Sequence, residues 1–137
     1  MNRQVAITGM GLVTPIGHTK EEFWSNLISG KSGVNKITKF DSSMLPTQIA
    51  AEIKGFDPLE YIEKKQVRRM DLSQQYAIVG TGRALKDSGI NLDLIDRDLA
   101  GVVIGSGVGG METFEKQQTV VVKEGPSRVS PFFVPMM

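Results

Sequence analysis

The glycine-rich segment at residues 105–110 has a spacing that suits phosphate binding. Gly105, Gly107 and Gly110 match G-x-G-x-x-G after an apolar stretch, and Glu124 follows 19 residues past Gly105. In dinucleotide-binding folds this turn lets the backbone approach a pyrophosphate, and an acid about 20 residues further on binds the ribose. Nucleotide binding is therefore one hypothesis, with residues 119–123 as its second strand.

Other features of the same segment argue against that hypothesis. The preceding strand comes late in the chain, whereas the fingerprint usually opens its domain. The doubled Gly109-Gly110 favours a mobile loop, and residues 111–118 are barely two turns of helix, which is short for a crossover. An earlier loop, Gly9-x-Gly11, lacks the third glycine. Tight strand exits in a close-packed sheet explain both loops more simply.

A dense group of cations offers a second kind of chemistry, the electrostatic capture of an acidic partner. Opposite fields speed encounter and weaken with salt. A run of charges is also typical of a plain solvated face. Nucleic-acid binding is disfavoured because the net charge is only +1 and few aromatic side chains lie between the cations. The cluster consists of Lys64, Lys65, Arg68 and Arg69, with Arg128 as a further cation.

Nucleophiles and metal ligands are scarce. The chain has no cysteine and one histidine, His18, which excludes a disulfide, a thiolate metal site, a cysteine nucleophile and a two-histidine metal site within these residues. His18 precedes a helix cap, so we expect a surface residue and not a catalyst. We expect no metal and no cofactor. No apolar run approaches the ~20 residues of a membrane span, and no charged leader opens the chain, so we expect a cytoplasmic protein.

The elements that must position these residues alternate between strand and helix, which predicts an α/β fold with a mostly parallel sheet. Capping residues mark the helix starts, and glycines mark several ends. We expect strands over residues 4–8, 49–53 and 99–105. We expect helices from Thr19 to Gly30, from Asp57 through Tyr61 and Ile62, from Asp71 to about Ser88, and from Met111 to about Val122, and we expect the chain from Gly125 onward to be extended.

Two glycines interrupt the longest predicted helix. Gly80 and Gly82 each cost about 1 kcal/mol relative to alanine inside a helix. Two such losses favour close packing against another backbone, and a kink is the alternative.

The sequence ends on an apolar run, Ser130 to Met137. Chain ends are usually exposed and polar unless something holds them. We therefore expect this segment to be buried by residues outside this chain, as in a piece of a larger protein.

Four segments in order resemble one family, the β-ketoacyl-[acyl carrier protein] synthases. The similarity is greatest to synthase II, the elongating condensing enzymes of bacterial type II fatty acid synthesis, and it covers the whole chain. The segments are Val5-Ala6-Ile7-Thr8-Gly9-Met10-Gly11-Leu12-Val13-Thr14-Pro15-Ile16-Gly17, Arg68-Arg69-Met70-Asp71, Ile104-Gly105-Ser106-Gly107-Val108-Gly109-Gly110 and Ser130-Pro131-Phe132-Phe133-Val134-Pro135.

The resemblance implies a thiolase-like layered α/β/α/β/α fold, of which residues 1–137 are the N-terminal portion of one ketoacyl synthase domain. Such enzymes load an acyl chain on a cysteine, decarboxylate malonyl-carrier and join the two by a Claisen condensation. That chemistry needs a thiolate nucleophile and donors for the developing oxyanions. The family uses one cysteine and two histidines, none of which can be assigned here, so we expect the chain alone to be inactive.

The resemblance also implies binding roles for residues that are present. Val108 would border the fatty chain, and Phe133 and Val134 would reach across a homodimer interface toward the partner's pocket. Acyl carrier protein would dock on Lys64, Lys65, Arg68, Arg69 and Arg128, with Lys65, Arg68 and Arg69 most strongly implicated. The competing interpretations are plain core for the three apolar residues and a solvated face for the five cations.

Two other functions remain open at this point. A non-catalytic relative that sets chain length or partners an active subunit would also lack the nucleophile. A dinucleotide-binding domain is the third. A cysteine downstream of Met137, on the next strand–helix turn, would favour the enzyme over the silent subunit.

Overall fold

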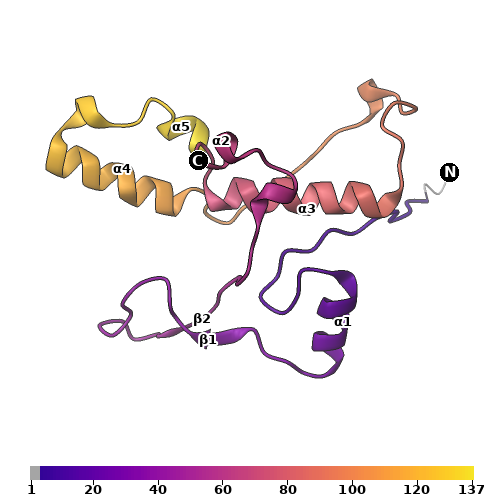
Figure 1. The fold of residues 1–137 in the computed structure, drawn as a ribbon, viewed down its shortest axis with the longest axis horizontal. Coiled ribbons are helices and arrows are strands. Elements are labelled where there is room, and N and C mark those ends of the chain that lie inside the picture. The colour runs from indigo at the N-terminus through magenta and orange to yellow at the C-terminus, as the bar shows by residue number, and fades with distance from the viewer. Residues whose placement is uncertain (1–3) are drawn as a thin grey trace.

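Helices dominate the computed structural model, which describes residues 4–137. Helix α3 lies at the centre, with α2, α4 and α5 gathered near its N-terminal end and α1 and a small hairpin on the other side (Figure 1). The elements are α1 (Lys20–Ile28), β1 (Val34–Lys36), β2 (Ile49–Ala51), α2 (Lys64–Val67), α3 (Leu72–Ser88), α4 (Met111–Glu124) and α5 (Phe133–Met136). Single 3-10 turns occur at η1 (Pro58–Glu60), η2 (Arg97–Leu99) and η3 (Pro126–Arg128).

Helix α3 confirms the prediction from its caps. The Asp71 side chain accepts a hydrogen bond from the Ser73 amide at 3.0 Å, which satisfies one of the free N–H groups of the first turn. Gly89, at φ 63°, ends the helix in the left-handed conformation. Gln74 does not close a capping box, because its side-chain amide donates to the Pro135 carbonyl at 2.9 Å.

Helices α1 and α4 also form where the sequence predicts them. Thr19 Oγ1 accepts from the Glu22 amide at 3.1 Å and caps the helix, whereas Glu22 Oε2 accepts from the amide of His18, the residue before the cap, at 2.9 Å. Helix α4 begins immediately after Gly110 and continues to Glu124, two residues beyond the expected end.

The strands expected over residues 4–8 and 99–105 are not formed. Residues 4–13 and 100–106 form neither a helix nor a paired strand. Val5 and Val103, one in each segment, are 93% and 97% exposed. A strand is stable only when its N–H and C=O groups pair with a neighbour, and the described residues offer neither segment such a partner.

The sheet that does form is an antiparallel pair, so the expectation of a mostly parallel sheet is wrong for residues 4–137. Strand β1 pairs with β2 in the register Val34↔Ala51 and Lys36↔Ile49. The prediction of a strand at residues 49–53 is confirmed over Ile49–Ala51. Its partner, strand β1, was not predicted, because a strand of three residues is too short to show an alternation of apolar and polar side chains.

Two helical predictions need correction. The helix expected from Asp57 is the single turn η1, and the basic residues that follow it lie in and after the separate helix α2. The stretch after Gly125, expected to be extended, contains η3 and α5. Pro126 and Pro135 fit because they lie in the first turn of each element, where an N–H has no partner within the helix.

Glycines allow the chain around residues 9–11 to lie directly on α3. A Cβ at Gly11 would overlap the Gly80 carbonyl oxygen and lie 2.6 Å from the Ala84 nitrogen, and one at Gly9 would lie 2.6 Å from the Ser88 nitrogen. The Gly80 main chain does lie against Gly11, but the prediction that close packing explains the glycine at position 80 is wrong, since a Cβ at Gly80 would meet nothing within 4 Å. Gly82 is tightly packed, but against a side chain: its Cβ would lie 2.6 Å from Cε1 of Tyr61.

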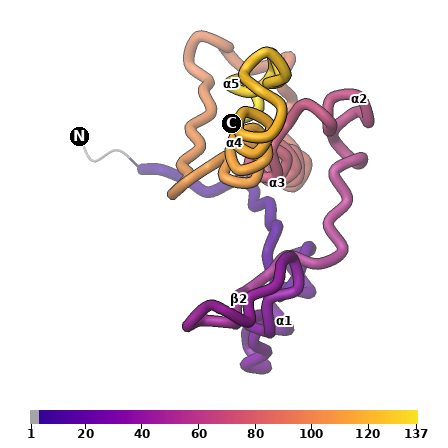
Figure 2. The backbone as a smooth tube through the Cα atoms, turned by 90° about the vertical axis from the view of Figure 1, so that its left-hand side faces the viewer, coloured from indigo at the N-terminus to yellow at the C-terminus, as the bar shows by residue number. Residues whose placement is uncertain are grey.

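Much apolar surface is uncovered in this structure. The accessible surface is 10857 Å², whereas a compact monomer of this mass exposes about 7,000 Å². Within residues 4–137, Ile62 and Val79 are the buried large apolar side chains, and of these Val79 is fully buried. The hairpin and α1 lie apart from the α3–α4–α5 group when the molecule is turned (Figure 2). Among the described helices, none is long and apolar enough to cross a membrane.

The contact between Gly11 and α3 leads to a paired prediction. We expect Gly11→Ala to destabilise the protein by about 2 kcal/mol, since the new methyl group must displace backbone. We expect Gly80→Ala at the same contact to stabilise it by up to ~1 kcal/mol, because a Cβ at Gly80 meets open space and helix propensity improves. Urea unfolding followed by circular dichroism measures both, and equal effects of the two substitutions would contradict the packing described here.

Candidate functional site

The predicted basic cluster surrounds helix α2 and faces solvent. Lys64 and Lys65 lie within the helix, Arg68 is its C-terminal cap and Arg69 follows, and all four side chains are exposed. In the described part of the chain, Lys64, Lys65 and Arg68 enter no salt bridge. Their charges are therefore available to an approaching anion.

The remaining two cations of the predicted set are already engaged. The guanidinium carbon of Arg69 lies 4.5 Å from the centre of the Phe132 ring, a cation–π geometry. Arg128, at the end of η3, pairs with Glu124 of α4 at 3.7 Å. This exposed pair is weak and leaves Arg128 able to exchange partners.

Helix α2 owes its position to α3. Four residues are too few for a stable isolated helix. The buried Gln75 side chain of α3 donates to the Val67 carbonyl at 3.3 Å and to the Met70 carbonyl at 3.0 Å. These two hydrogen bonds hold the end of α2, and with it the cluster, against the first turns of α3.

The predicted acyl-pocket residues lie on two segments that meet. Val108 is 73% exposed in the loop before α4, and Phe133 and Val134 open α5. A Cβ at Gly110 would lie 2.7 Å from Cβ of Met137, so the loop packs directly on the end of α5. The rings of Phe133 and Phe114, 6.1 Å apart, join α5 to α4. The structure therefore brings these residues into one region.

Asp71 links both segments to α3. Its Oδ1 accepts from the amide and hydroxyl of Ser73, each at 3.0 Å. Its Oδ2 accepts from the hydroxyl of Thr113 at 2.7 Å and from the Thr113 amide at 3.3 Å. Burial raises the pKa of the Asp71 carboxyl, but the four hydrogen bonds outweigh that effect and hold the pKa below its ordinary value.

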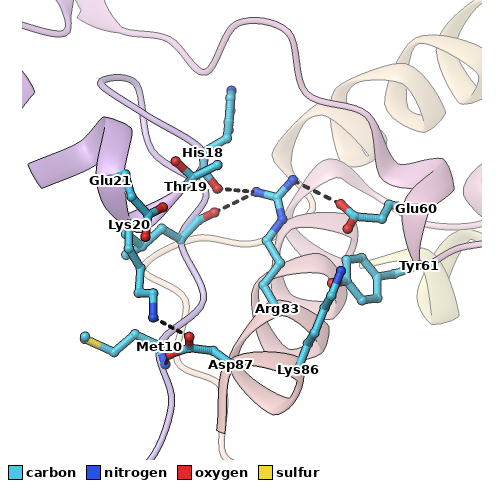
Figure 3. Close-up of a pocket in the computed structure, with 11 residues that line it drawn as sticks. Met10, His18, Thr19, Lys20, Glu21, Glu60, Tyr61, Arg83, Lys86 and Asp87 are labelled. Carbon is cyan, nitrogen blue, oxygen red and sulfur yellow. Dashed lines mark hydrogen bonds and ion pairs between the residues drawn. The ribbon is translucent and has the colours of Figure 1, made fainter. Parts of the chain in front are cut away.

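A cavity of about 480 Å³, which the sequence did not predict, lies between α1, η1 and the C-terminal half of α3 (Figure 3). Two ion pairs join its walls, and Glu21 and Lys86 line it without a salt bridge to any described residue. Arg83 Nη1 donates to the Leu12 and His18 carbonyls at 2.8 and 3.0 Å, and Arg83 Nη2 faces Glu60 at 3.4 Å. Lys20 pairs with Asp87, which also accepts from the Met10 amide. This arrangement fastens the N-terminal loop to α3 and leaves no evident nucleophile and base.

His18 is half-buried, so it is a surface residue only in part. Its Nε2 lies 2.7 Å from the Lys54 carbonyl oxygen, and its Nδ1 is buried without a partner. A ring nitrogen facing a carbonyl must carry the proton, which fixes the tautomer. That His18 is no catalyst stays a prediction.

The structure weakens the dinucleotide hypothesis. Residues 119–123, its proposed second strand, lie inside α4, and Glu124 is the last residue of that helix. A ribose-binding acid belongs at the end of a second parallel strand, beside the glycine turn. Helix α4 places 14 residues between Gly110 and Gly125, which separates the acid from the turn.

Within residues 4–137 there is also no cluster of three potential metal ligands.

Comparison with solved structures identifies the class of fold. The ishigamide ketosynthase/chain length factor superposes with a TM-score of 0.77 over 93% of this chain and 32% of its own, at 26% identity. A beta-ketoacyl synthase from Burkholderia phymatum gives a TM-score of 0.74 over 96% of this chain and 33% of its own, at 29% identity. The fold is the thiolase-like ketosynthase fold, of which this chain forms a partial α/β portion.

The family follows from the sequence as a whole. Residues 2–137 match the model of the beta-ketoacyl synthase N-terminal domain, and the chain belongs to that family. The 3-oxoacyl-[acyl-carrier-protein] synthase 2 of Staphylococcus aureus is 46% identical over 99% of this chain. The chain spans about a third of the length of that relative, 33%.

The lowered pKa of Asp71 gives a pH prediction. A carboxyl whose pKa is lower in the folded protein stabilises it above the unfolded pKa of about 3.9, and that contribution is lost as the pH falls through the folded pKa. We therefore expect Asp71→Asn to reduce the free energy of unfolding at pH 6 and to reduce it by less at pH 3. Urea titrations at both pH values measure the two differences, and a deficit that is the same at both would show that the charge contributes nothing.

Proposed function

We propose that this chain is part of a β-ketoacyl-[acyl carrier protein] synthase of type II fatty acid synthesis. The observation that carries the proposal is the family match over residues 2–137, with relatives named 3-oxoacyl-[acyl-carrier-protein] synthase 2 at up to 46% identity. In the reaction, a thiolate first takes the acyl group from its carrier. Malonyl-carrier then loses carbon dioxide, and its α-carbon attacks the acyl carbonyl and releases the thiolate.

The described residues supply binding surfaces in this proposal and not the reacting groups. The chain has no cysteine, and the side chain of its histidine is hydrogen-bonded to a backbone carbonyl. The nucleophile and the two histidines of the family would come from the other two-thirds of the protein. This chain alone is therefore expected to be inactive in condensation.

Acyl carrier protein is the proposed partner of the basic cluster at α2. Three unpaired cations on a helix that α3 holds in place form a positive patch with a fixed shape. Such a patch favours encounter with an acidic protein and costs little ordering on binding. Lys65 and Arg68 are the central residues, Lys64 and Arg69 flank them, and Arg128, beyond the C-terminal end of α4, would meet a separate part of the carrier. Arg69 and Arg128 must first release Phe132 and Glu124.

Val108, Phe133 and Val134 are proposed to line the path of the acyl chain. Val108 and Val134 are both more than two-thirds exposed, which is unfavourable for apolar side chains in water unless something covers them. An alkyl chain against these residues would gain about 0.8 kcal/mol per buried methylene. Phe133 and Val134 are proposed to meet a second copy of the protein, as homodimerisation would require. A cytoplasmic location remains part of the same proposal.

A second candidate function has an observation of its own in its favour. A matched structure is named as a ketosynthase/chain length factor, and the chain-length proteins of this superfamily were the alternative left open by the missing cysteine. In that case the acyl wall described here would set product length without catalysis. The two candidates differ in whether the full-length protein releases carbon dioxide from malonyl-carrier.

The chain-length role of Val108 provides the direct test of the proposal. Full-length protein is given octanoyl- or tetradecanoyl-carrier with malonyl-carrier, and the β-ketoacyl product is measured by mass spectrometry. We expect product from the wild-type protein. We expect Val108→Phe to lower kcat/KM about tenfold for tetradecanoyl relative to octanoyl, because the larger ring fills the path of the chain.

The matched control is Val122→Phe on α4, at a valine with nearly the same exposure, 74% against 73%. It should leave the ratio of the two substrates unchanged. No product from the wild-type protein would overturn the synthase and favour the chain-length subunit. An equal shift of the ratio in both variants would remove Val108 from the acyl wall.

Carrier docking is tested by reversing one charge. We expect Lys65→Glu to raise KM about tenfold for carrier-bound substrate, with a smaller change in kcat and a weaker dependence on salt. The same acyl group on coenzyme A bypasses the carrier, so its KM should stay within twofold. Lys31→Glu, an exposed lysine just after α1, is the control for net charge. If it raised KM as much as Lys65→Glu, docking at α2 would be wrong.

A further inference from the structure

The carboxylate of Asp71 caps two helices at once. One oxygen accepts hydrogen bonds from Ser73 in the first turn of α3, and the other accepts hydrogen bonds from Thr113 in the first turn of α4. The residue before α4 is Gly110, which has no side chain to cap its own helix. Asp71 therefore supplies from α3 the acceptor that α4 lacks, and its negative charge lies at the N-terminal ends of both helix dipoles.

The same residue also holds α5. The Asp71 amide donates to the Met136 carbonyl at 3.1 Å. Gln74, one turn further along α3, donates to the Pro135 carbonyl at 2.9 Å. The loop that carries Val108 and the helix that begins with Phe133 are thus both fastened to the start of α3, one through the side chain of Asp71 and the other through its backbone.

We propose that Asp71 is a positioning residue that, through Thr113, sets the separation between the Val108 loop and α5 and thereby the length of acyl chain that is accepted. This inference rests on the proposed acyl wall and goes beyond it, because Asp71 need not touch the acyl chain. Asp71 is 7% exposed and Thr113 is 6% exposed, so water cannot readily replace their bond. A weakened bond frees the first turn of α4 and the loop that precedes it.

The experiment compares three variants in the full-length protein. Thr113→Val keeps the shape of the side chain and removes the hydroxyl that donates to Asp71. Thr113→Ser restores that hydroxyl. Thr19→Val makes the same substitution at the start of α1, where the Thr19 hydroxyl accepts from the Glu22 amide. It controls for loss of stability away from the two segments.

The first readout is the ratio of kcat/KM for tetradecanoyl- and octanoyl-carrier. We expect Thr113→Val to change this ratio about fivefold, Thr113→Ser to stay within about twofold of wild type, and Thr19→Val to lower both rates alike. An unchanged ratio in Thr113→Val, or an equal change in Thr19→Val, would overturn the chain-length role.

The second readout does not depend on activity. Hydrogen exchange is measured for peptides that cover residues 106–114 and 133–136 in wild type, Thr113→Val and Asp71→Asn. Faster exchange of residues 106–114 in both variants supports positioning by the Asp71 side chain, and unchanged exchange of that segment in Asp71→Asn overturns it. Residues 133–136 are the internal comparison, because the Asp71 amide that holds them is kept in both variants. A wild-type protein that makes no product would overturn the proposed function and its chain-length consequence, and exchange would still decide whether the Asp71 side chain holds the Val108 loop.

Discussion

The arrangement of the described chain depends on how closely its N-terminal loop lies on helix α3. Gly9 and Gly11 place main chain against main chain at Gly80, Ala84 and Ser88, where no side chain would fit. Arg83 and Asp87 on the same stretch of α3 then bind the carbonyls and amide of that loop. Direct backbone contact leaves little freedom for sliding or rotation, so α3 becomes the reference to which the other segments are fixed.

The opposite end of α3 fixes the functional segments by a different means. Three polar side chains in its first turn each bind a separate part of the chain. Asp71 holds α4, Gln74 holds α5 and Gln75 holds the end of α2. The proposed carrier surface and the proposed acyl wall therefore share one support. Steric exclusion fixes one end of α3 and directional hydrogen bonds fix the other, since hydrogen bonds set orientation where apolar contacts do not.

Capping residues in the sequence correctly predicted most of the helices. The predictions that depended on contacts between distant segments, such as strand pairing, were wrong. Thr19, Asp71 and Gly89 act through their own backbone neighbours, so α1 and α3 were correctly placed. The segments at 4–8 and 99–105 have the composition of strands, but composition does not reveal which segment would pair with them. Both remain unpaired in the described structure. The basic cluster and the glycine loop that carries Val108 were visible in the sequence, and the family resemblance supplied their expected roles. The cavity around Arg83, and the bond of Asp71 to Thr113 across 42 positions, leave no trace in the sequence because they arise only on packing.

Gln75 has a consequence for the order in which the protein assembles during synthesis. Helix α2 precedes α3 in the chain and is too short to persist alone, and the side chain that completes it belongs to α3. While the ribosome has released only the residues before Leu72, Lys64 and Lys65 lie on unstructured polypeptide. The positive patch acquires its shape only after α3 has emerged and wound. A nascent chain therefore exposes no ordered form of the proposed carrier surface until its framework exists, and engagement of acyl carriers by incomplete protein would be delayed.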